Sequence, residues 1–530
     1  MTQQSFRFRG RAAPRLAPAR RLRLAALLAG LVVSVPAAVW SQPGGEAEAD
    51  DVAARVKPAL VQVFTIANPA DLLSPWQGIG TEKYVGSGTI VAGNRILTNA
   101  HLVADHVSVE VKRQGMTRSY AARVVHVGHA CDLALLEVEE AAFFADVEPL
   151  AVGALPSLQD SVEVYGFPVG GESISVTSGI VSRIEMGRYT HSGVQLLMTQ
   201  IDAALNPGNS GGPVIDDGKI VGVAVQTLEG AENVGYAVPA PVVQHFLDDI
   251  ADDRFDGFPT LGVDWQTVAN QALRQTLGLE SDETGGLVGR INDGSTAAGV
   301  LAPGDVLLAI DGSTVAEDLT IPLGPELRVA AAYAVQRKQV GERVELTFAR
   351  GQRRMLASAE LVNAPMLVPG PRYDEKPSYL IFGGLVFQPL TLDYLEFLYE
   401  WEDDLGNYAY NHYFRSRERH QVILLSKVLA APVNRGYHEW TNVIVGTVQG
   451  EVPRDMQHLV RLIDAAEGPW LDIVTERSER LVLDLKVARA EGEAILERYG
   501  VPAAHSPDLQ PAPGPSEVGA AQEKGPPAGN

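Results

Sequence analysis

The feature that most constrains this sequence is a series of short apolar runs between residues 58 and 239. They are rich in Val, Ile and Leu and separated by Gly, Asn or Asp; examples are GSGTIV, HVSVEV, DLALLEV and KIVGVAV. Many short β-branched runs with turn residues between them are typical of a β-barrel or β-sandwich. The segment APVVQHFLDDIADD, residues 240–253, has helical spacing instead, and we expect it to close this domain.

The chain of 530 residues is long enough for about three domains. Composition divides it into a flexible lead (42–51), a first domain (52–255), a second unit (259–363), a Pro-rich linker (364–377), a third unit (378–500) and a disordered tail (501–530). The second unit contains strand-like segments such as ERVELTFAR, and a segment, ELRVAAAYAVQRK, that we expect to be helical.

Residues 1–41 have the features of a secretory signal peptide. They contain seven Arg and no acidic residue, with an apolar run at 24–39. The run is short for a membrane span and contains Ser34 and Pro36. We expect cleavage before Gln42 and an exported, periplasmic protein. The alternative is a retained anchor, the only case in which we expect membrane contact.

Composition also argues against several classes of function. The net charge of -22 disfavours a nucleic-acid partner, because phosphate contacts need a basic surface. Cys131 is the single Cys, which rules out an intramolecular disulfide and a Cys-based structural zinc site. The sequence has neither an H-E-x-x-H motif nor a G-x-x-x-x-G-K-[ST] motif, so we expect no metal and no cofactor.

Three residues in separate motifs are candidates for nucleophilic catalysis. Ser210 lies in ALNPGNSGGPVI, where a Gly-rich curl can aim backbone N–H groups at an oxyanion; the candidate donors span Gly208, Asn209 and Ser210. His101 follows the apolar run RILT, and Asp132 begins the run DLALLEV. His101 would take the Ser210 proton and pass it to the leaving amine, and Asp132 would hold the imidazole tautomer and stabilise its cation.

Each of these residues also has a purely structural interpretation. Ser210 would then be a hairpin residue, Asp132 a turn residue and His101 one of 11 His in the chain. The order His, Asp, Ser along one β-rich segment favours the catalytic interpretation. Three neighbouring His do not follow an apolar run and a T-N-A step: His106, His126 and His129.

Together these motifs resemble the HtrA/Deg family of trypsin-like serine proteases. The resemblance rests on GSGTIV, LTNAHLV, CDLALLEV, VTSGIVSRI, QIDAALNPGNSGGPVID and VGYAVP, within residues 52–250. LAPGDVLLAIDG resembles a PDZ signature, and SYLIFGGLVFQPLT and GYHEWTNVIVGTVQGEVP resemble the diverged second PDZ domain of plant-type Deg proteases. The resemblance implies a mainly β chain, with a chymotrypsin-like double β-barrel followed by two PDZ-like α/β domains.

The same resemblance implies an activity. It indicates an ATP-independent serine endopeptidase, assembled as a homotrimer or a multiple of it, that degrades unfolded or damaged exported proteins. Asn209 stands where trypsin-like zymogens carry Asp, so we expect regulation by the loops 167–175 and 226–234 rather than by propeptide cleavage. The alternatives are a holdase chaperone and a PDZ scaffold, in which proteolysis is secondary.

Substrate contacts are partly predictable from the family fold. Ala204, six residues before the nucleophile, would form the floor of the primary pocket, with Leu205, Val223 and Val225 as its walls. Such an uncharged pocket favours Val, Ala, Leu or Ile before the scissile bond. The alternative is that these four are ordinary core residues.

The second unit contains a candidate peptide-binding loop. Leu261, Gly262 and Val263 in TLGVDWQ would offer backbone N–H groups to a peptide carboxylate while the peptide adds as a strand. A plain turn and strand is the alternative. The equivalent stretch of the third unit, Gly384 to Phe387, is a weaker candidate.

Residues 390–414 form a segment rich in aromatic and acidic side chains that a minimal PDZ domain does not need. An apolar stripe at helical spacing comprises Tyr394, Phe397, Leu398, Trp401 and Leu405. Because clustered aromatic residues are favoured at interfaces, we hypothesise that the segment docks on another subunit or covers a peptide groove. The alternative is that the stripe packs on its own domain.

Overall fold

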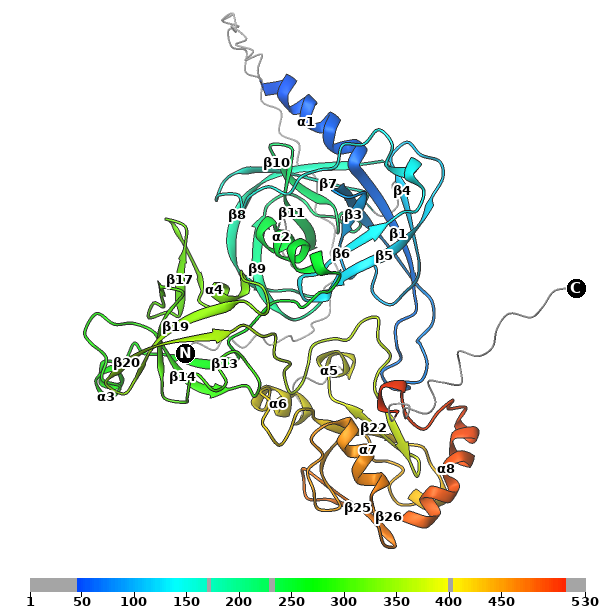
Figure 1. Cartoon of the computed structure of the whole chain (residues 1–530). Coiled ribbons are helices and arrows are strands. Elements are labelled where there is room, and N and C mark those ends of the chain that lie inside the picture. Colours follow the sequence, from blue (N-terminus) through cyan, green and yellow to red (C-terminus); the bar gives the residue numbers. More distant parts are fainter. Residues whose placement is uncertain (1–44, 169–172, 228–233, 399–403, 511–530) are drawn as a thin grey trace, which may run out of the picture. The chain divides into compact units, whose positions relative to one another are not determined.

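The computed structural model describes residues 45–168, 173–227, 234–398 and 404–510, and its architecture is mainly β (Figure 1). The first sheet closes on itself, because β1 pairs with both β2 and β4. Its strands, in barrel order, are β1 (Leu60–Ala67), β2 (Glu82–Val91), β3 (Arg95–Thr98), β6 (Leu133–Glu137), β5 (Tyr120–Gly128) and β4 (His106–Arg113). Leu60, Ile96 and Leu135 are fully buried in its core, and each such side chain contributes about 1.5–3 kcal/mol on burial.

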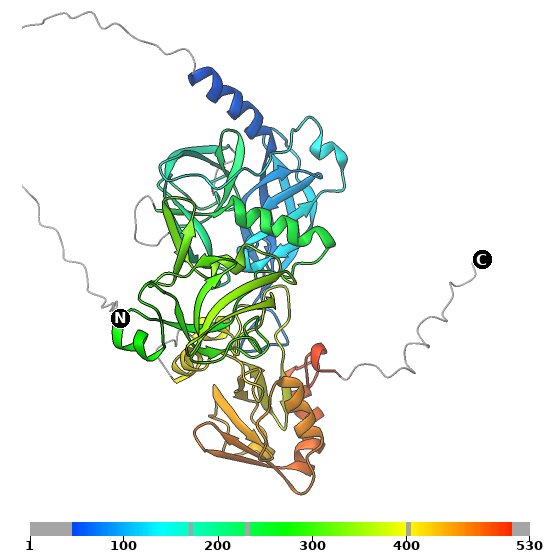
Figure 2. The same cartoon turned by 60° about the vertical axis from the view of Figure 1, so that its left-hand side comes forward.

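A second closed barrel follows. Its strands, in order, are β10 (Pro213–Asp216), β11 (Lys219–Thr227), β12 (Gly235–Pro239), β9 (Gln195–Ile201), β8 (Ser175–Arg188) and β7 (Ser161–Gly166). Asp217 and Gly218, both with positive φ, make the two-residue turn between β10 and β11. Helix α2 (Ala240–Asp249) packs on β11 and β12, and Figure 2 shows the two barrels side by side. The predicted double barrel with a closing helix is confirmed.

The second unit is built on a separate antiparallel sheet. Its strands, in sheet order, are β13 (Val263–Thr267), β14 (Gly286–Ile291), β15 (Val306–Ile310), β19 (Arg343–Arg350) and β20 (Arg353–Glu360), with β16 (Ser313–Thr314) paired to β15. Helix α3 (Gln271–Thr276) and the hairpin of β17 (Thr320–Leu323) and β18 (Leu327–Ala330) complete it. Strand β13 lies at an edge of the sheet, the position that strand addition by a peptide requires.

The prediction that ELRVAAAYAVQRK forms a helix is wrong for most of this segment. Its first half forms β18, and only α4 (Tyr333–Gln336) is helical. Val329 is 2% exposed and pairs with Ile321 across the hairpin, so cross-strand packing overrides the local helix propensity.

The third unit contains a six-stranded antiparallel sheet. Its strands, in order, are β21 (Leu380–Phe382), β22 (Leu385–Pro389), β23 (Ile423–Val428), β24 (Val443–Val448), β25 (Trp470–Thr475) and β26 (Arg480–Asp484). Helix α7 (Met456–Asp464) contacts β24, and helix α8 (Leu485–Tyr499) contacts β21, β25 and β26. Asp484 caps the first turn of α8, and Gly500 with positive φ ends it.

Both ends of the described chain differ from expectation. The predicted flexible lead overlaps helix α1 (Gly45–Ala59), whose segment is rich in the helix formers Ala and Glu. The predicted tail is structured up to Gln510, because Val501 and Leu509 are buried and Ser506 bonds to Tyr379. Residues 1–44 and 511–530, with the predicted signal peptide, lie outside the described residues, as do 169–172 and 228–233 of the two predicted regulatory loops.

The aromatic segment of the third unit packs largely within its own chain. Tyr394, Leu395 and Leu405, from α5 (Leu392–Leu398) and α6 (Asp404–Asn411), are buried together with Leu367 and Val368. Phe397 remains 45% exposed, and Trp401 lies outside the described residues. The subunit contact therefore stays a hypothesis. Among the described residues, no helix has both the length and the apolar character required to cross a membrane.

Candidate active site

A short turn before β6 positions Asp132. The turn His129–Cys131 is a 3-10 helix anchored by the fully buried Cys131, and Asp132 follows it in the left-handed region, at φ 53°. Asp tolerates this conformation better than most residues. The buried Asn99 donates its side-chain N–H to the Asp132 carbonyl over 2.8 Å. The turn and the Asn99 hydrogen bond therefore fix the backbone that carries the Asp132 carboxylate.

His101 and Asp132 are brought together by the ends of β3 and β5. The Nδ1 of His101 lies 2.7 Å from one carboxylate oxygen of Asp132, and the backbone N–H of His101 donates to the other oxygen over 2.8 Å. Asp132 is 1% exposed. With Nδ1–H donating to the carboxylate, the Nε2 atom of a neutral His101 is left as an acceptor.

The pair shifts both pKa values. Burial of the His101 imidazole lowers its pKa, but the charge and hydrogen bond of Asp132 outweigh this, so the pKa is raised above its ordinary value. Burial raises the pKa of Asp132, but the charge and hydrogen bonds of His101 lower it more. Each partner therefore favours the charged form of the other.

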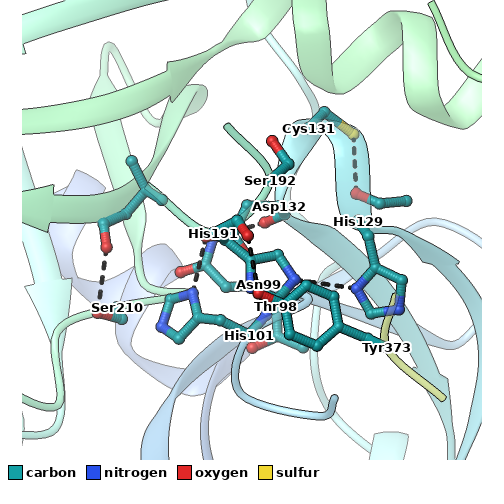
Figure 3. A network of polar contacts seen from close by, with 12 residues as sticks. Thr98, Asn99, His101, His129, Cys131, Asp132, His191, Ser192, Ser210 and Tyr373 are labelled. Atoms are coloured by element: carbon teal, nitrogen blue, oxygen red, sulfur yellow. Dashed lines mark hydrogen bonds and ion pairs between the residues drawn. The ribbon is translucent and has the colours of Figure 1, made fainter. Parts of the chain in front are cut away.

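Ser210 lies in the turn before β10, on the other barrel. Its hydroxyl donates to the carbonyl oxygen of Val225 over 3.5 Å, and no hydrogen bond joins it to His101 among the described residues. Val225 sits at an irregularity in the pairing of β11 with β12. In Figure 3 the imidazole of His101 lies between Ser210 and Asp132.

The loop at Ser210 leaves two backbone donors free. Within the described part of the chain, the N–H groups of Gly208 and Ser210 have no hydrogen-bond partner, whereas that of Asn209 donates to the Asn206 carbonyl over 2.9 Å. Gly208 has φ 100°, which a side chain would strain. Of the three predicted oxyanion residues, Gly208 and Ser210 are thus the ones with N–H groups available.

Ser87 supports this loop, a role that sequence reasoning missed. The hydroxyl of Ser87 donates to the Gly208 carbonyl over 2.7 Å and accepts the N–H of Phe167 over 2.8 Å. Its backbone N–H donates to the Ser210 carbonyl over 2.8 Å. GSGTIV contains Ser87, but the motif alone gives no signal for a contact 121 residues away.

The predicted pocket residues separate into two groups. Ala204 is exposed, and Leu205 is half-buried against the core. Val223 and Val225 are 1% and 7% exposed and belong to the barrel core. Both side chains are therefore buried in the barrel core, and their role as pocket walls stays a prediction.

The predicted peptide loop of the second unit lies at the free edge strand. Leu261 is buried, Gly262 has φ 67°, and Val263 begins β13. The N–H groups of Leu261 and Gly262 have no bonded partner in the described chain. A Cβ at Gly262 would lie 2.3 Å from the Cβ of Ser295, so the position admits only Gly without rearrangement.

The equivalent stretch of the third unit does not offer such an edge. Gly384 to Phe387 lies at β22, which pairs with β21 on one side and β23 on the other. Strand β21 takes the edge position of the sheet. The backbone N–H of Ile381 in β21 donates in turn to the carbonyl oxygen of Ala504. The prediction of a peptide site there is therefore corrected: its backbone groups are already used within the sheet.

Comparison with known families identifies the class of protein. The model of the trypsin-like peptidase domain matches residues 86–223, and that of a PDZ domain matches residues 368–508. The chain is thus a trypsin-like serine peptidase with a PDZ domain.

Relatives define the family more closely. Putative protease Do-like 3, mitochondrial, of Arabidopsis thaliana is 37% identical over 86% of this chain and 80% of its own length. Protease Do-like 2, chloroplastic, of the same organism is 40% identical over 85% and 75%. This chain belongs to the HtrA/Deg family of Do-like proteases. Among solved structures, HtrA-type protease AlgW with decapeptide matches with a TM-score of 0.46 and 24% identity, over 60% of this chain and 98% of that one.

Proposed function

We propose that the protein is an ATP-independent serine endopeptidase in which His101, Asp132 and Ser210 form the catalytic triad. The observation that carries this proposal is the hydrogen bond between His101 Nδ1 and the buried Asp132 carboxylate, because it leaves Nε2 as the base beside Ser210. Membership of the HtrA/Deg family supports the same assignment.

The reaction begins with a turn of the Ser210 side chain away from the Val225 carbonyl and towards His101. His101 then takes the hydroxyl proton as the oxygen attacks the scissile carbonyl, and Asp132 stabilises the imidazolium. The N–H groups of Gly208 and Ser210 bind the oxyanion; the loss of one such donor typically costs about 3–4 kcal/mol of barrier. His101 then protonates the leaving amine, which leaves an acyl ester on Ser210. A water molecule that gives a proton to His101 attacks this ester, and His101 returns the proton to the Ser210 oxygen as the acid product leaves.

Its substrates are unfolded or damaged exported proteins, and the enzyme works as a homotrimer or a multiple of it. The uncharged side chains of Ala204 and Leu205 favour small or branched apolar residues before the scissile bond. The basic and apolar composition of residues 1–41 supports export to the periplasm. The relatives named above are described as mitochondrial and chloroplastic, so export of this chain needs a direct test. Mass spectrometry of the intact protein after expression in a bacterium would show whether the chain is cleaved before Gln42.

Casein digestion by the purified protein tests the assignment. We expect Ser210→Ala to lose several orders of magnitude in rate while Ser178→Ala, an exposed position on β8, keeps wild-type activity. Equal digestion by wild type and Ser210→Ala would exclude the triad. Suppression of aggregation without cleavage would indicate a holdase, and capture of C-terminal peptides without turnover would indicate a scaffold.

A further inference from the structure

Three aromatic rings from separate parts of the chain meet beside His101 (Figure 3). His129 precedes Asp132 in the 3-10 turn, His191 lies between β8 and β9, and Tyr373 belongs to the linker after the second unit. The rings of His191 and Tyr373 stack with centroids 4.0 Å apart and an interplanar angle of 16°. His129 lies 4.9 Å from Tyr373 and 5.2 Å from His191, and His191 lies 6.2 Å from His101.

Hydrogen bonds fix the linker in this position. The hydroxyl of Tyr373 donates to the His191 carbonyl over 2.8 Å. Asp374 accepts from His129 Nε2 over 2.9 Å and exchanges reciprocal backbone-to-carboxylate bonds of 2.6 and 2.8 Å with Asp105, four residues after His101. The linker is therefore attached to the loop that carries the proposed base.

The three rings give the cluster an aromatic surface. Because His129 Nε2–H donates to Asp374, its Nδ1 accepts from the Nε2–H of His191, 2.9 Å away, when both rings are neutral. Burial lowers the pKa of His191 to about 4, so this ring is uncharged at neutral pH. Although imidazoles and carboxylates are close together, no group of three in the described chain is arranged to hold a metal ion.

The rings of this cluster are partly exposed, as is His101 itself. The side chains of His101 and His129 keep 31% and 24% of their area exposed, and Tyr373 is partly exposed as well. A peptide cleaved by Ser210 must pass across Ser210 and His101. A side chain of that peptide close to the scissile bond would then lie near His101, within reach of the neighbouring rings.

We propose that His129, His191 and Tyr373 form the wall of the subsite that holds the second substrate residue before the scissile bond. A residue of the linker, Tyr373, would then help to set substrate specificity. The inference rests on the proposed function. The wall presents aromatic faces, which favour apolar and aromatic side chains. The carboxylates of Asp105, Asp132 and Asp374 lie beside it and disfavour an acidic side chain.

Peptides that differ only at this residue, carrying Leu, Ala or Asp, test the proposal on the full-length enzyme. We expect wild type to prefer Leu over Ala and Ala over Asp. Tyr373→Ala should lower kcat/KM for the Leu peptide about tenfold and change the Ala peptide less than about twofold, because only the larger side chain reaches the wall. Tyr373→Phe keeps the stacked ring and should retain the Leu preference. Tyr410→Ala is the control, since Tyr410 is 78% exposed in α6.

Binding of the same peptides to Ser210→Ala, measured by fluorescence anisotropy, separates recognition from chemistry. A loss of Leu preference on adding Tyr373→Ala to that background would support the subsite. An equal change for all three peptides, or no change, would overturn it. If wild-type cleavage does not depend on Ser210, the proposed function fails instead, whatever the Tyr373 variants do.

Discussion

The hydroxyl of Ser87, on β2 of the first barrel, donates a 2.7 Å hydrogen bond to the carbonyl oxygen of Gly208, in the Ser210 loop of the second barrel. Ser87 is fully buried, and its backbone N–H also bonds to the Ser210 carbonyl. Ser87 and the proposed base, His101, both belong to the first barrel. The proposed nucleophile is thus held in place by the same barrel that supplies the proposed base.

Ser87→Ala should therefore weaken both stability and catalysis. It leaves the Gly208 carbonyl and the Phe167 N–H buried without this partner, at a cost of about 1–3 kcal/mol. Because the oxyanion donors belong to the same loop, we expect kcat to fall at least about tenfold. Urea unfolding and peptide hydrolysis measure the two effects, with Ser178→Ala as the control. Wild-type kcat with reduced stability would show that the hydrogen bond serves folding alone.

The acid limb of kcat/KM should lie above pH 6.5. In the proposed mechanism the free enzyme needs neutral His101. Because Asp132 raises the pKa of His101, activity should be lost as the pH falls through this raised value. Asp132→Asn removes the charge and should move the limb to lower pH while reducing the rate. A pH–rate profile of a short peptide substrate measures this. If the acid limb of the kcat/KM profile stays at the same pH in Asp132→Asn, the titrating group is not His101.

His191 should make the fold less stable in acid. Its folded pKa is about 4, below the ordinary value of about 6.5, so the unfolded chain binds the extra proton as the pH falls between these values. Stability is therefore present above pH 6.5 and declines towards pH 4, by about 2–3 kcal/mol for this group. In urea unfolding at several pH values, His191→Gln should flatten the decline. Ser178→Ala, which removes no titrating group, should not, and equal slopes for both variants would contradict the prediction.

Peptides that end in an apolar C-terminal residue should bind at one place on each chain, the edge of β13. Gly262→Ala should abolish binding to Ser210→Ala protein, because the added Cβ strains a positive φ and meets Ser295 at 2.3 Å. Gly289→Ala on β14, where the added Cβ meets only ordinary contacts, is the matched control. Isothermal titration calorimetry gives the stoichiometry. Binding of two peptides per chain would contradict this prediction, because a second site at β22 would require that strand to lose its pairing with a neighbouring strand.

Much of the architecture was predictable from local pattern. The apolar runs and turn residues between 58 and 239 predicted a β-barrel or β-sandwich, because a strand and its turn are encoded within a few neighbouring residues. The double barrel was implied by the resemblance to the HtrA/Deg family. The pairing of His101 with Asp132 was expected from two motifs that each end or begin a strand, and the hydrogen bond joins them as predicted. The role of Ser210 as nucleophile stays a prediction, since its hydroxyl bonds to Val225.

Other features depend on contacts between residues far apart in the chain. Ser87 with Gly208, Tyr373 with His191, and β21 at the edge beside β22 carry no periodicity or motif of their own. Packing decides them, because a hydroxyl or ring acquires a partner only when the surrounding elements have folded. The helix expected at ELRVAAAYAVQRK failed for the same reason: burial of Val329 in a hairpin outweighed its local propensity. The sequence by itself therefore determined the strands and the chemical groups, and the tertiary structure decided which of those groups meet.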